Sequence, residues 1–146
     1  MHVKSTFLGL VALAALALGG CAHMGEPAHS AAARQRVVVQ VSDADPGKWN
    51  LALNNARNMQ SDLGAANVDI EIVAYGPGIA MLEKKSAVSQ RIDEATLSGV
   101  KVVTCENTMH GHKLTKSDML DGIGYVPAGV VEIMKKQREG WSYLRP

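Results

Sequence analysis

The chain has 146 residues, which is enough for one domain built around a single hydrophobic core. Apolar residues make up 47% of the chain, charged residues 20% and aromatic residues only 4%, so we expect a core of aliphatic side chains. The formal net charge is only +1 and the sequence contains no basic stripe, which argues against a nucleic-acid-binding protein.

The first 20 residues are predicted to be a signal peptide. Lys4 supplies a positive charge, and an unbroken apolar run of twelve residues follows from Phe7 to Leu18. A run of this length is too short to span a hydrocarbon core of about 30 Å as a helix. We therefore expect residues 1–20 to be removed, which would leave 14 basic and 14 acidic residues in the mature protein.

The end of this segment predicts a lipid anchor on Cys21. The stretch Leu18-Gly19-Gly20-Cys21 resembles the lipobox of bacterial lipoproteins, in which the cysteine becomes the lipid-modified first residue. Ala22 in place of Asp resembles lipoproteins that are sorted to the outer membrane. Residues 21–34 are small and polar and indicate a flexible tether, so we expect a periplasmic domain attached to a membrane. An ordinary signal peptide followed by an incidental cysteine is the alternative.

From residue 35 onward, strand-like and helix-like segments alternate. The β-branched run at 36–41 predicts a strand that is buried on both faces. A helix should follow, with Asp45 as N-cap, Pro46 in its first turn and Gly64 at its end. Residues 67–76 alternate apolar and acidic side chains, which predicts a strand with one more exposed face. The buried stripe expected for the helix comprises Trp49, Leu53, Ala56, Met59 and Leu63.

The second half of the domain continues this alternation and predicts an α/β fold. Strands and helices in this order form βαβ units, so we expect a three-layer α/β/α domain over residues 35–146 with a mainly parallel sheet of about five strands. The elements expected after residue 76 are a tight turn at 76–78, one or two short helices ending at Gly99, a strand at 100–105, a capping box from Thr115 to Asp118, a strand at 123–126, a helix at 127–140 with Val130, Ile133, Met134 and Gln137 on one stripe, and a final strand at 141–146.

The stretch VVTCENTMHGH, residues 102–112, holds the candidate catalytic residue, Cys105. Cys105 ends a predicted strand, and in open α/β sheets chemistry collects at the carboxyl ends of the strands. Asn107 and Thr108 are suited to capping a helix that begins there. The backbone N–H groups of such a helix start favour thiolate over thiol, whereas the neighbouring Glu106 opposes it.

Two other interpretations of Cys105 remain open. A free cysteine is often a small buried packing residue with no chemical role. Alternatively, Cys105 could bind a metal ion with His110 and His112, although this spacing is not a strong zinc signature. If Cys21 is lipidated, Cys105 is the one remaining thiol, and no disulfide can form within the mature chain. We predict no cofactor.

Four motifs together resemble the DsrE/DsrF-like family over residues 36–146: D-P-x-K-W-N, Y-G-P-G, C-x-N-T-M and Q-R-E-G-W-x-Y. The resemblance implies a three-layer α/β/α fold that assembles into homo-oligomers. It also implies sulfur relay, in which a cysteine accepts sulfane sulfur as a persulfide and passes it to a partner. Cys105 occupies the cysteine of C-x-N-T-M. The relay partners of the family are cytoplasmic, so the predicted export leaves the sulfur donor and acceptor unidentified.

The sequence thus supports three functions of different classes. In the first, Cys105 carries sulfane sulfur or does thiol redox chemistry, Asn107 and Thr108 lower its pKa, and His110 or His112 assists proton transfer. In the second, the protein is a non-catalytic oligomeric binding or scaffold module that is tethered to the membrane. In the third, cysteine and histidine side chains bind a metal ion.

Overall fold

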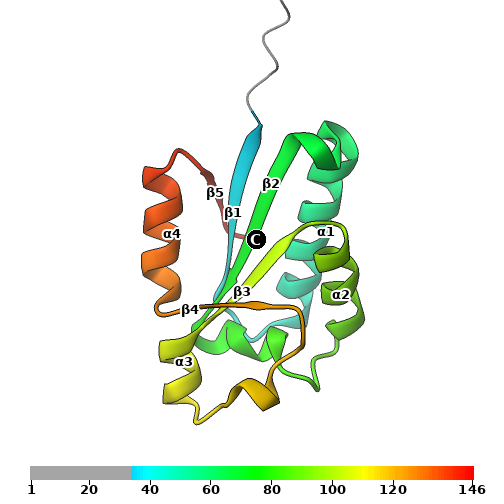
Figure 1. Cartoon of the computed structure of the whole chain (residues 1–146). Helices are drawn as coiled ribbons and strands as arrows, with labels where there is room; N and C mark the ends of the chain where they lie inside the picture. The colour runs from blue at the N-terminus through cyan, green and yellow to red at the C-terminus, as the bar shows by residue number, and fades with distance from the viewer. Residues whose placement is uncertain (1–33) are drawn as a thin grey trace, which may run out of the picture. The chain divides into compact units, whose positions relative to one another are not determined.

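The computed structural model describes residues 34–146, which form an α/β domain (Figure 1). The predicted signal peptide, the predicted lipidation site Cys21 and residues 22–33 of the predicted tether lie outside the described residues. Between residues 34 and 146, no helix combines the length and the apolar character that crossing a membrane requires.

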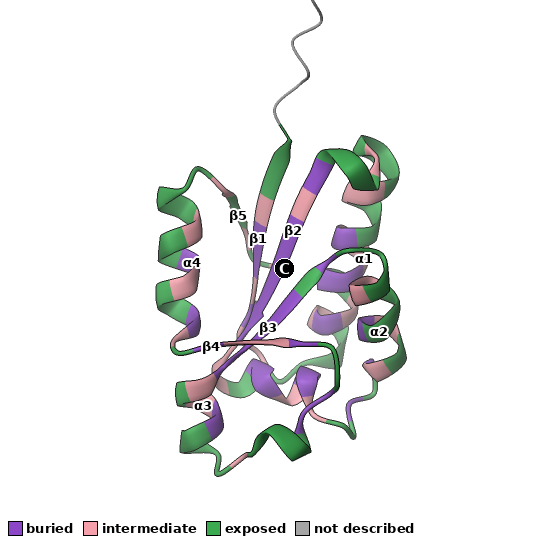
Figure 2. Cartoon of the chain, in the orientation of Figure 1, coloured by how far each residue is buried: buried purple, intermediate pink, exposed green. Residues whose placement is uncertain are grey.

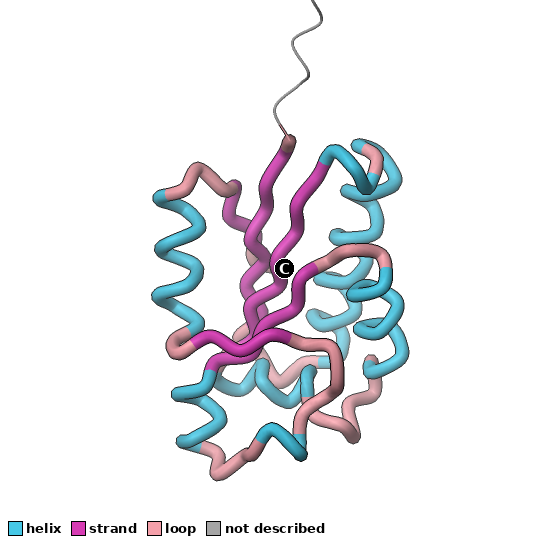
Figure 3. The backbone as a smooth tube through the Cα atoms, viewed as in Figure 1, coloured by secondary structure: helices cyan, strands magenta, loops and turns pink. Residues whose placement is uncertain are grey.

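A five-stranded sheet in the order β4-β3-β2-β1-β5 forms the middle layer, and every pair of neighbouring strands is parallel. The predicted fold class is confirmed, and the sheet is parallel throughout. Because the strands all run the same way, their carboxyl ends share one edge of the sheet (Figure 3). The strands are β1 (Gln35–Val41), β2 (Val68–Ala74), β3 (Lys101–Cys105), β4 (Gly124–Val126) and β5 (Ser142–Leu144).

The helices cover the two faces of the sheet unequally. Two helices, α1 and α2, pack on one face, whereas α4 alone packs on the other, over β1, β2 and β5 (Figure 1). The α-helices are α1 (Pro46–Leu63), α2 (Ser89–Leu97), α3 (Glu106–Gly111) and α4 (Gly129–Arg138). Short 3-10 helices occupy Ala65–Asn67, Gly76–Leu82 and Lys116–Asp118.

Helix α1 begins and ends as its sequence predicts. The carboxylate of Asp45 accepts a hydrogen bond from the Gly47 N–H at 2.8 Å, and Pro46 stands in the first turn, where its missing N–H costs nothing. Gly64 has a φ of 85°, which stops the helix at a conformation that glycine adopts without strain. The chain then turns back to start β2 beside β1.

The core is divided by the sheet into two unequal parts (Figure 2). The larger part lies between the sheet and α1 with α2, and it contains Trp49, Leu53 and Ala56 of the predicted stripe. Leu63 was also expected there but is 43% exposed, because the last turn of α1 borders an open groove beside Leu144. The smaller part, under α4, consists of Val38, Val73, Val103, Val126 and Ile133.

The prediction of an exposed face on β2 is wrong at Glu71, which is fully buried. Helix α4 covers this position and brings the ammonium group of Lys136 to 3.1 Å from one carboxylate oxygen, while Lys101 lies at 3.1 Å from the same oxygen. Within the described residues, the other oxygen has no hydrogen-bond partner. Burial lowers the pKa of Lys136, but the hydrogen bond and charge of Glu71 outweigh it and raise the pKa overall.

The predicted apolar stripe of α4 is also only partly correct. Ile133 is buried, but Val130 and Met134 are about half exposed, and Gln137 is exposed. The helix instead rests on the sheet through Gly129 and Ile133 and through the ion pair of Lys136. An apolar surface on α4 therefore faces solvent in the single chain.

We predict that Glu71→Gln lowers the free energy of unfolding by about 3 kcal/mol, because the change leaves a largely buried Lys136 ammonium with only the more distant Glu132 carboxylate, 3.7 Å away, as counter-charge. Asp69→Asn is the matched control. Asp69 lies two residues earlier on the same face of β2, but its ion pair with Arg34 is exposed, so the loss should stay below about 1 kcal/mol. Urea denaturation measures both variants, and equal losses would contradict a structural role for the buried pair.

Candidate functional site

Cys105 lies where β3 ends and α3 begins, at the edge of the sheet that holds the carboxyl ends of the strands (Figure 3). It is the N-cap residue of α3, and its side chain shares the α4 face of the sheet with Val103. The residue is 5% exposed. Helix α4 begins shortly after β4, the strand next to β3, so two helix starts lie near the sulfur.

Polar groups near the sulfur of Cys105 favour its ionised form. The hydroxyl of Thr108 contributes most, followed by the backbone N–H groups of Gly129, Thr108 and Asn107, although the N–H of Asn107 makes its hydrogen bond to the Pro127 carbonyl oxygen. Burial by itself raises the pKa of the Cys105 thiol, but these donors outweigh burial, and the pKa is lower than that of an ordinary cysteine. One acceptor is also present, because the carbonyl oxygen of Pro127 lies 3.9 Å from the sulfur and can accept the S–H of the neutral thiol.

A second hydrogen bond orients the hydroxyl of Thr108. Its oxygen accepts the backbone N–H of Gly76 at 3.0 Å, which leaves the hydroxyl proton free to point at the sulfur. Gly76 adopts a φ of 53°, a left-handed conformation that favours glycine. The Y-G-P-G turn after β2 thus fixes the proton donor of the C-x-N-T-M segment after β3.

The connection from β4 to α4 is fastened to the same place. The N–H of Asn107 donates to the carbonyl oxygen of Pro127 at 3.1 Å, which ties the start of α3 to the residues that precede α4. The side chain of Asn107 itself is exposed. The prediction that Asn107 and Thr108 cap the helix is therefore wrong in detail. Cys105 is the N-cap residue, and both lie in the first turn of α3.

The two predicted supporting histidines lie at the other end of α3. His110 is in its last turn, His112 follows it, and both are exposed. Neither makes a hydrogen bond to Cys105 within the described residues, and their part in proton transfer stays a prediction. From residue 34 to the carboxyl terminus, no three His, Cys, Asp or Glu side chains gather where they could hold a metal ion.

Sequence reasoning missed three residues of the site: Tyr75, Pro127 and Gly129. Turn geometry accounts for Gly76 of the Y-G-P-G motif, which has a positive φ, whereas Gly78 is required by space, because a Cβ there would lie 2.4 Å from the Val41 carbonyl oxygen. The segment V-P-A-G, which leads into α4, contains the sequence feature that could have indicated Pro127 and Gly129. Alanine and glycine in place of a capping Ser, Thr, Asp or Asn leave a helix start with N–H groups that no side chain of its own satisfies.

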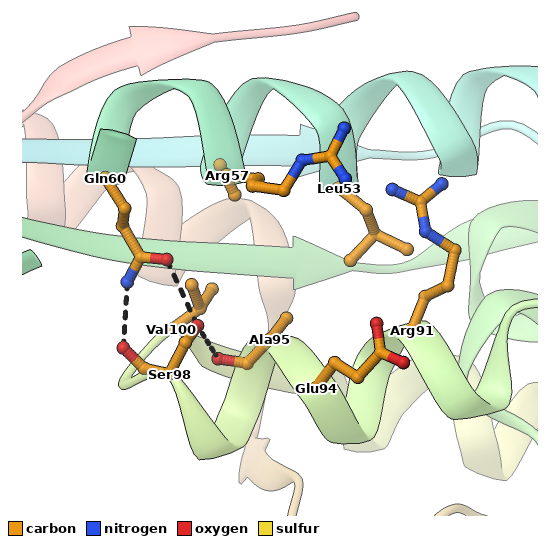
Figure 4. A pocket seen from close by; sticks show the side chains of 9 residues that line it. Leu53, Arg57, Gln60, Arg91, Glu94, Ala95, Ser98 and Val100 are labelled. Atoms are coloured by element: carbon orange, nitrogen blue, oxygen red, sulfur yellow. Dashed lines mark hydrogen bonds between the residues drawn. The ribbon is translucent and has the colours of Figure 1, made fainter. Parts of the chain in front are cut away.

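A groove between α1 and α2 is the other concave feature of interest (Figure 4). Its volume is about 170 Å³, which is below the usual range for small-molecule pockets. Hydrogen bonds between Gln60 and Ser98 close one end, while Arg91 near the other end is held by amide oxygens of Asn50 and Asn54. No residue of the Cys105 site lines this groove.

The comparison with protein families agrees with these motifs. The sequence pattern of the DsrE/DsrF-like family matches residues 35–146, the whole of the folded domain. The chain belongs to the DsrE/DsrF-like family. This family suggests a function of the sulfur-relay type. No curated protein matches the chain.

Solved structures of similar fold span the same domain. MTH1491 from Methanobacterium thermoautotrophicum, a protein of unknown function, is 37% identical, with a TM-score of 0.73 over 77% of this chain and 99% of its own. The ychN protein from E. coli is 18% identical, with a TM-score of 0.62 over 77% and 99% of the two chains. BT1422 from Bacteroides thetaiotaomicron, also of unknown function, is 15% identical, with a TM-score of 0.64 over 77% and 95%. The last two likenesses show the fold alone.

We predict that the Cys105 thiol of this DsrE-family chain has a pKa below that of an ordinary cysteine. Thr108→Val removes the hydroxyl donor and should raise the thiol pKa. It should also lower stability by about 1 kcal/mol, because the N–H of Gly76 loses its acceptor. The measurement is the pH dependence of thiol alkylation in a chain whose other cysteine is replaced by Cys21→Ser.

Thr104→Val is the matched control for this experiment. Thr104 immediately precedes Cys105 but faces the opposite side of β3, and its buried hydroxyl oxygen has no hydrogen-bond partner within residues 34–146. The change should leave the thiol pKa as it is and should not lower stability by more than about 0.5 kcal/mol. The same pKa shift in both threonine variants would refute the assigned role of the Thr108 hydroxyl.

Proposed function

We propose that the protein is a sulfane-sulfur carrier in which Cys105 holds the transferred sulfur atom as a persulfide. Membership of the DsrE/DsrF-like family supports chemistry of the sulfur-relay type. The observation that carries the proposal to this residue is the set of donors around its sulfur, which favours the thiolate in a buried place. The thiolate is the form of cysteine that attacks sulfur.

The transfer requires no external oxidant. The Cys105 thiolate attacks the outer sulfur of a donor persulfide, R–S–SH, so that a new sulfur–sulfur bond forms while the sulfur–sulfur bond of the donor breaks. The electron pair of the broken bond leaves with the donor as the thiolate R–S⁻, and the outer sulfur keeps its proton as Cys–S–SH. Attack of an acceptor thiolate on this outer sulfur repeats the exchange and returns Cys105 as a thiolate.

Access to the sulfur limits which donors react. Cys105 is only 5% exposed, and the start of α4 and the Y-G-P-G turn border it. A bulky donor therefore cannot reach the sulfur unless neighbouring residues move, whereas a small polysulfide or thiosulfate ion needs much less space.

A second candidate function is a scaffold without sulfur chemistry. The specific observation that favours it is the outer surface of α4, where Val130, Val131 and Met134 are each at least half exposed. Apolar side chains gathered in this way commonly mark an interaction surface. We propose that a second copy of the chain covers this surface, as the homo-oligomers of related proteins suggest, so that the assembly would exist under either function.

The sulfur-carrier function predicts that the full-length chain with Cys21→Ser gains the mass of one sulfur atom after exposure to polysulfide or thiosulfate. The gain should disappear on reduction and should be absent when Cys105→Ser is added. Intact-mass spectrometry measures it. Thr104→Val, which retains the sulfur and its donors, is the control that should still gain sulfur. A native chain that resists sulfur uptake, yet remains folded, would leave the scaffold function.

We further propose that the protein is exported and attached through a lipidated Cys21 to the periplasmic face of a bacterial membrane. Ala22, the residue after the cysteine, favours the outer membrane. Replacing Cys21 by serine should then move the chain from the membrane fraction to the soluble fraction of the producing cells. Sedimentation of that soluble form gives the size of the proposed homo-oligomer. An unchanged distribution between the fractions would exclude the anchor.

A further inference from the structure

The first residue of α4 lies against Tyr75 with no room for a side chain. A Cβ atom built on Gly129 would lie 2.9 Å from the Cβ of Tyr75, and 3.1 Å from its Cδ1 atom. Real Cβ atoms essentially never come within 3.0 Å of another heavy atom. The φ angle of Gly129 is not positive, so the backbone conformation does not require glycine there. Space alone excludes a larger residue.

The same residue also faces the sulfur of Cys105. The N–H of Gly129 is one of the donors to the sulfur, and the Pro127 carbonyl two residues earlier lies 3.9 Å from it. The N-cap residue, Ala128, has no side-chain oxygen to accept N–H groups of the first turn. Gly129 therefore lies against Tyr75, two residues after the carbonyl group that reaches the sulfur.

We propose that Gly129 is a positioning residue for Cys105, because its missing side chain lets α4 begin close enough to Tyr75 for the first N–H of the helix to reach the sulfur. The inference rests on the proposed function, because the sulfur atom that Gly129 would position is the one proposed to carry sulfane sulfur. Its geometry is independent of whether sulfur is transferred. Tyr75 acts as the opposing wall, and it sets how deep the start of the helix can sit.

A methyl group at position 129 must displace either α4 or Tyr75. The nearest obstacle is the Cβ of Tyr75, which is attached directly to the backbone and cannot rotate away. Displacement of the helix start lengthens the contact between its N–H and the sulfur, and the thiolate then loses a donor. Elsewhere in a helix, replacing glycine by alanine normally increases stability, so the expected sign here is opposite to the usual one.

The test is Gly129→Ala in the full-length chain with Cys21→Ser, measured by the pH–rate profile of alkylation and by the urea midpoint. We expect the apparent thiol pKa to rise and alkylation at neutral pH to slow by about threefold or more, because only the thiolate reacts. The urea midpoint should also fall. Gly111→Ala is the matched control, because Gly111 is helical, has no positive φ and has nothing within 4 Å of its added Cβ. Gly111→Ala should leave the pH–rate profile unchanged and should not lower the urea midpoint.

A double variant separates loss of position from general damage. Tyr75→Gly removes the three atoms nearest to the new methyl group, so Tyr75→Gly with Gly129→Ala should alkylate faster at neutral pH than Gly129→Ala alone. If the single variant does not fold, the double variant is compared with Tyr75→Gly alone, whose pH–rate profile it should match. A Gly129→Ala chain with a lower urea midpoint but the native pH–rate profile would overturn the proposal, as would a double variant without recovery.

Sulfur uptake, measured on the same samples, keeps the two proposals distinguishable. If the native chain takes up no sulfur and Gly129→Ala still raises the thiol pKa, the sulfur-carrier function fails and the positioning role of Gly129 stands. If sulfur uptake occurs and Gly129→Ala leaves the pH–rate profile unchanged, the sulfur-carrier function stands and the positioning role of Gly129 fails.

Discussion

Around the sulfur of Cys105, hydrogen-bond donors outnumber acceptors in a place that water hardly reaches. Burial alone would hold the cysteine as a neutral thiol, and the donors reverse that preference. Each donor belongs to a segment that starts at the carboxyl edge of the sheet, in α3 or in α4. The ionisation of one side chain therefore depends on the parallel order of β2, β3 and β4, which brings the ends of these strands together.

The position of α4 is fixed at both of its ends by contacts that leave little freedom. At its start, Gly129 touches Tyr75, and in its last turns Lys136 reaches the buried carboxylate of Glu71. A shift of the helix along the sheet would break the ion pair between Lys136 and the buried carboxylate of Glu71, which is costly. The same shift would move the first N–H away from Cys105. A polar contact far from the sulfur thus helps to define the geometry at the sulfur.

The fold was predictable because its signals are local and repeat along the chain. The β-branched runs, the Asp45–Pro46 helix start and the glycines that end helices predict a parallel α/β domain without any knowledge of distant contacts. The β-branched run at 100–105 placed Cys105 at a strand end for the same reason. Local patterns failed at Glu71 and Met134. Alternation suggested exposure for the first and helical spacing suggested burial for the second, but the way in which α4 lies on the sheet decides both.

The sequence failed to predict some residues of the candidate site for the same reason. Gly129 and Pro127 follow Cys105 by more than twenty residues, and their relation to the sulfur arises only when β4 pairs with β3. A backbone N–H is also invisible in a sequence, because every residue except proline has one. The sequence does show that no capping side chain precedes α4. This points to a site only once the structure places a sulfur nearby that can accept the free N–H groups.

The donors around Cys105 also bear on the direction of sulfur transfer. In the thiolate, the negative charge lies on the sulfur that the N–H groups and Thr108 surround. In an ionised persulfide, much of the charge moves to the outer sulfur, about 2 Å farther from these donors. The site therefore stabilises the thiolate more strongly than the persulfide anion. A stabilised thiolate is also the better leaving group when an acceptor attacks the outer sulfur. Such a site favours giving the sulfur away over storing it, which is the property that a carrier needs and a scaffold does not.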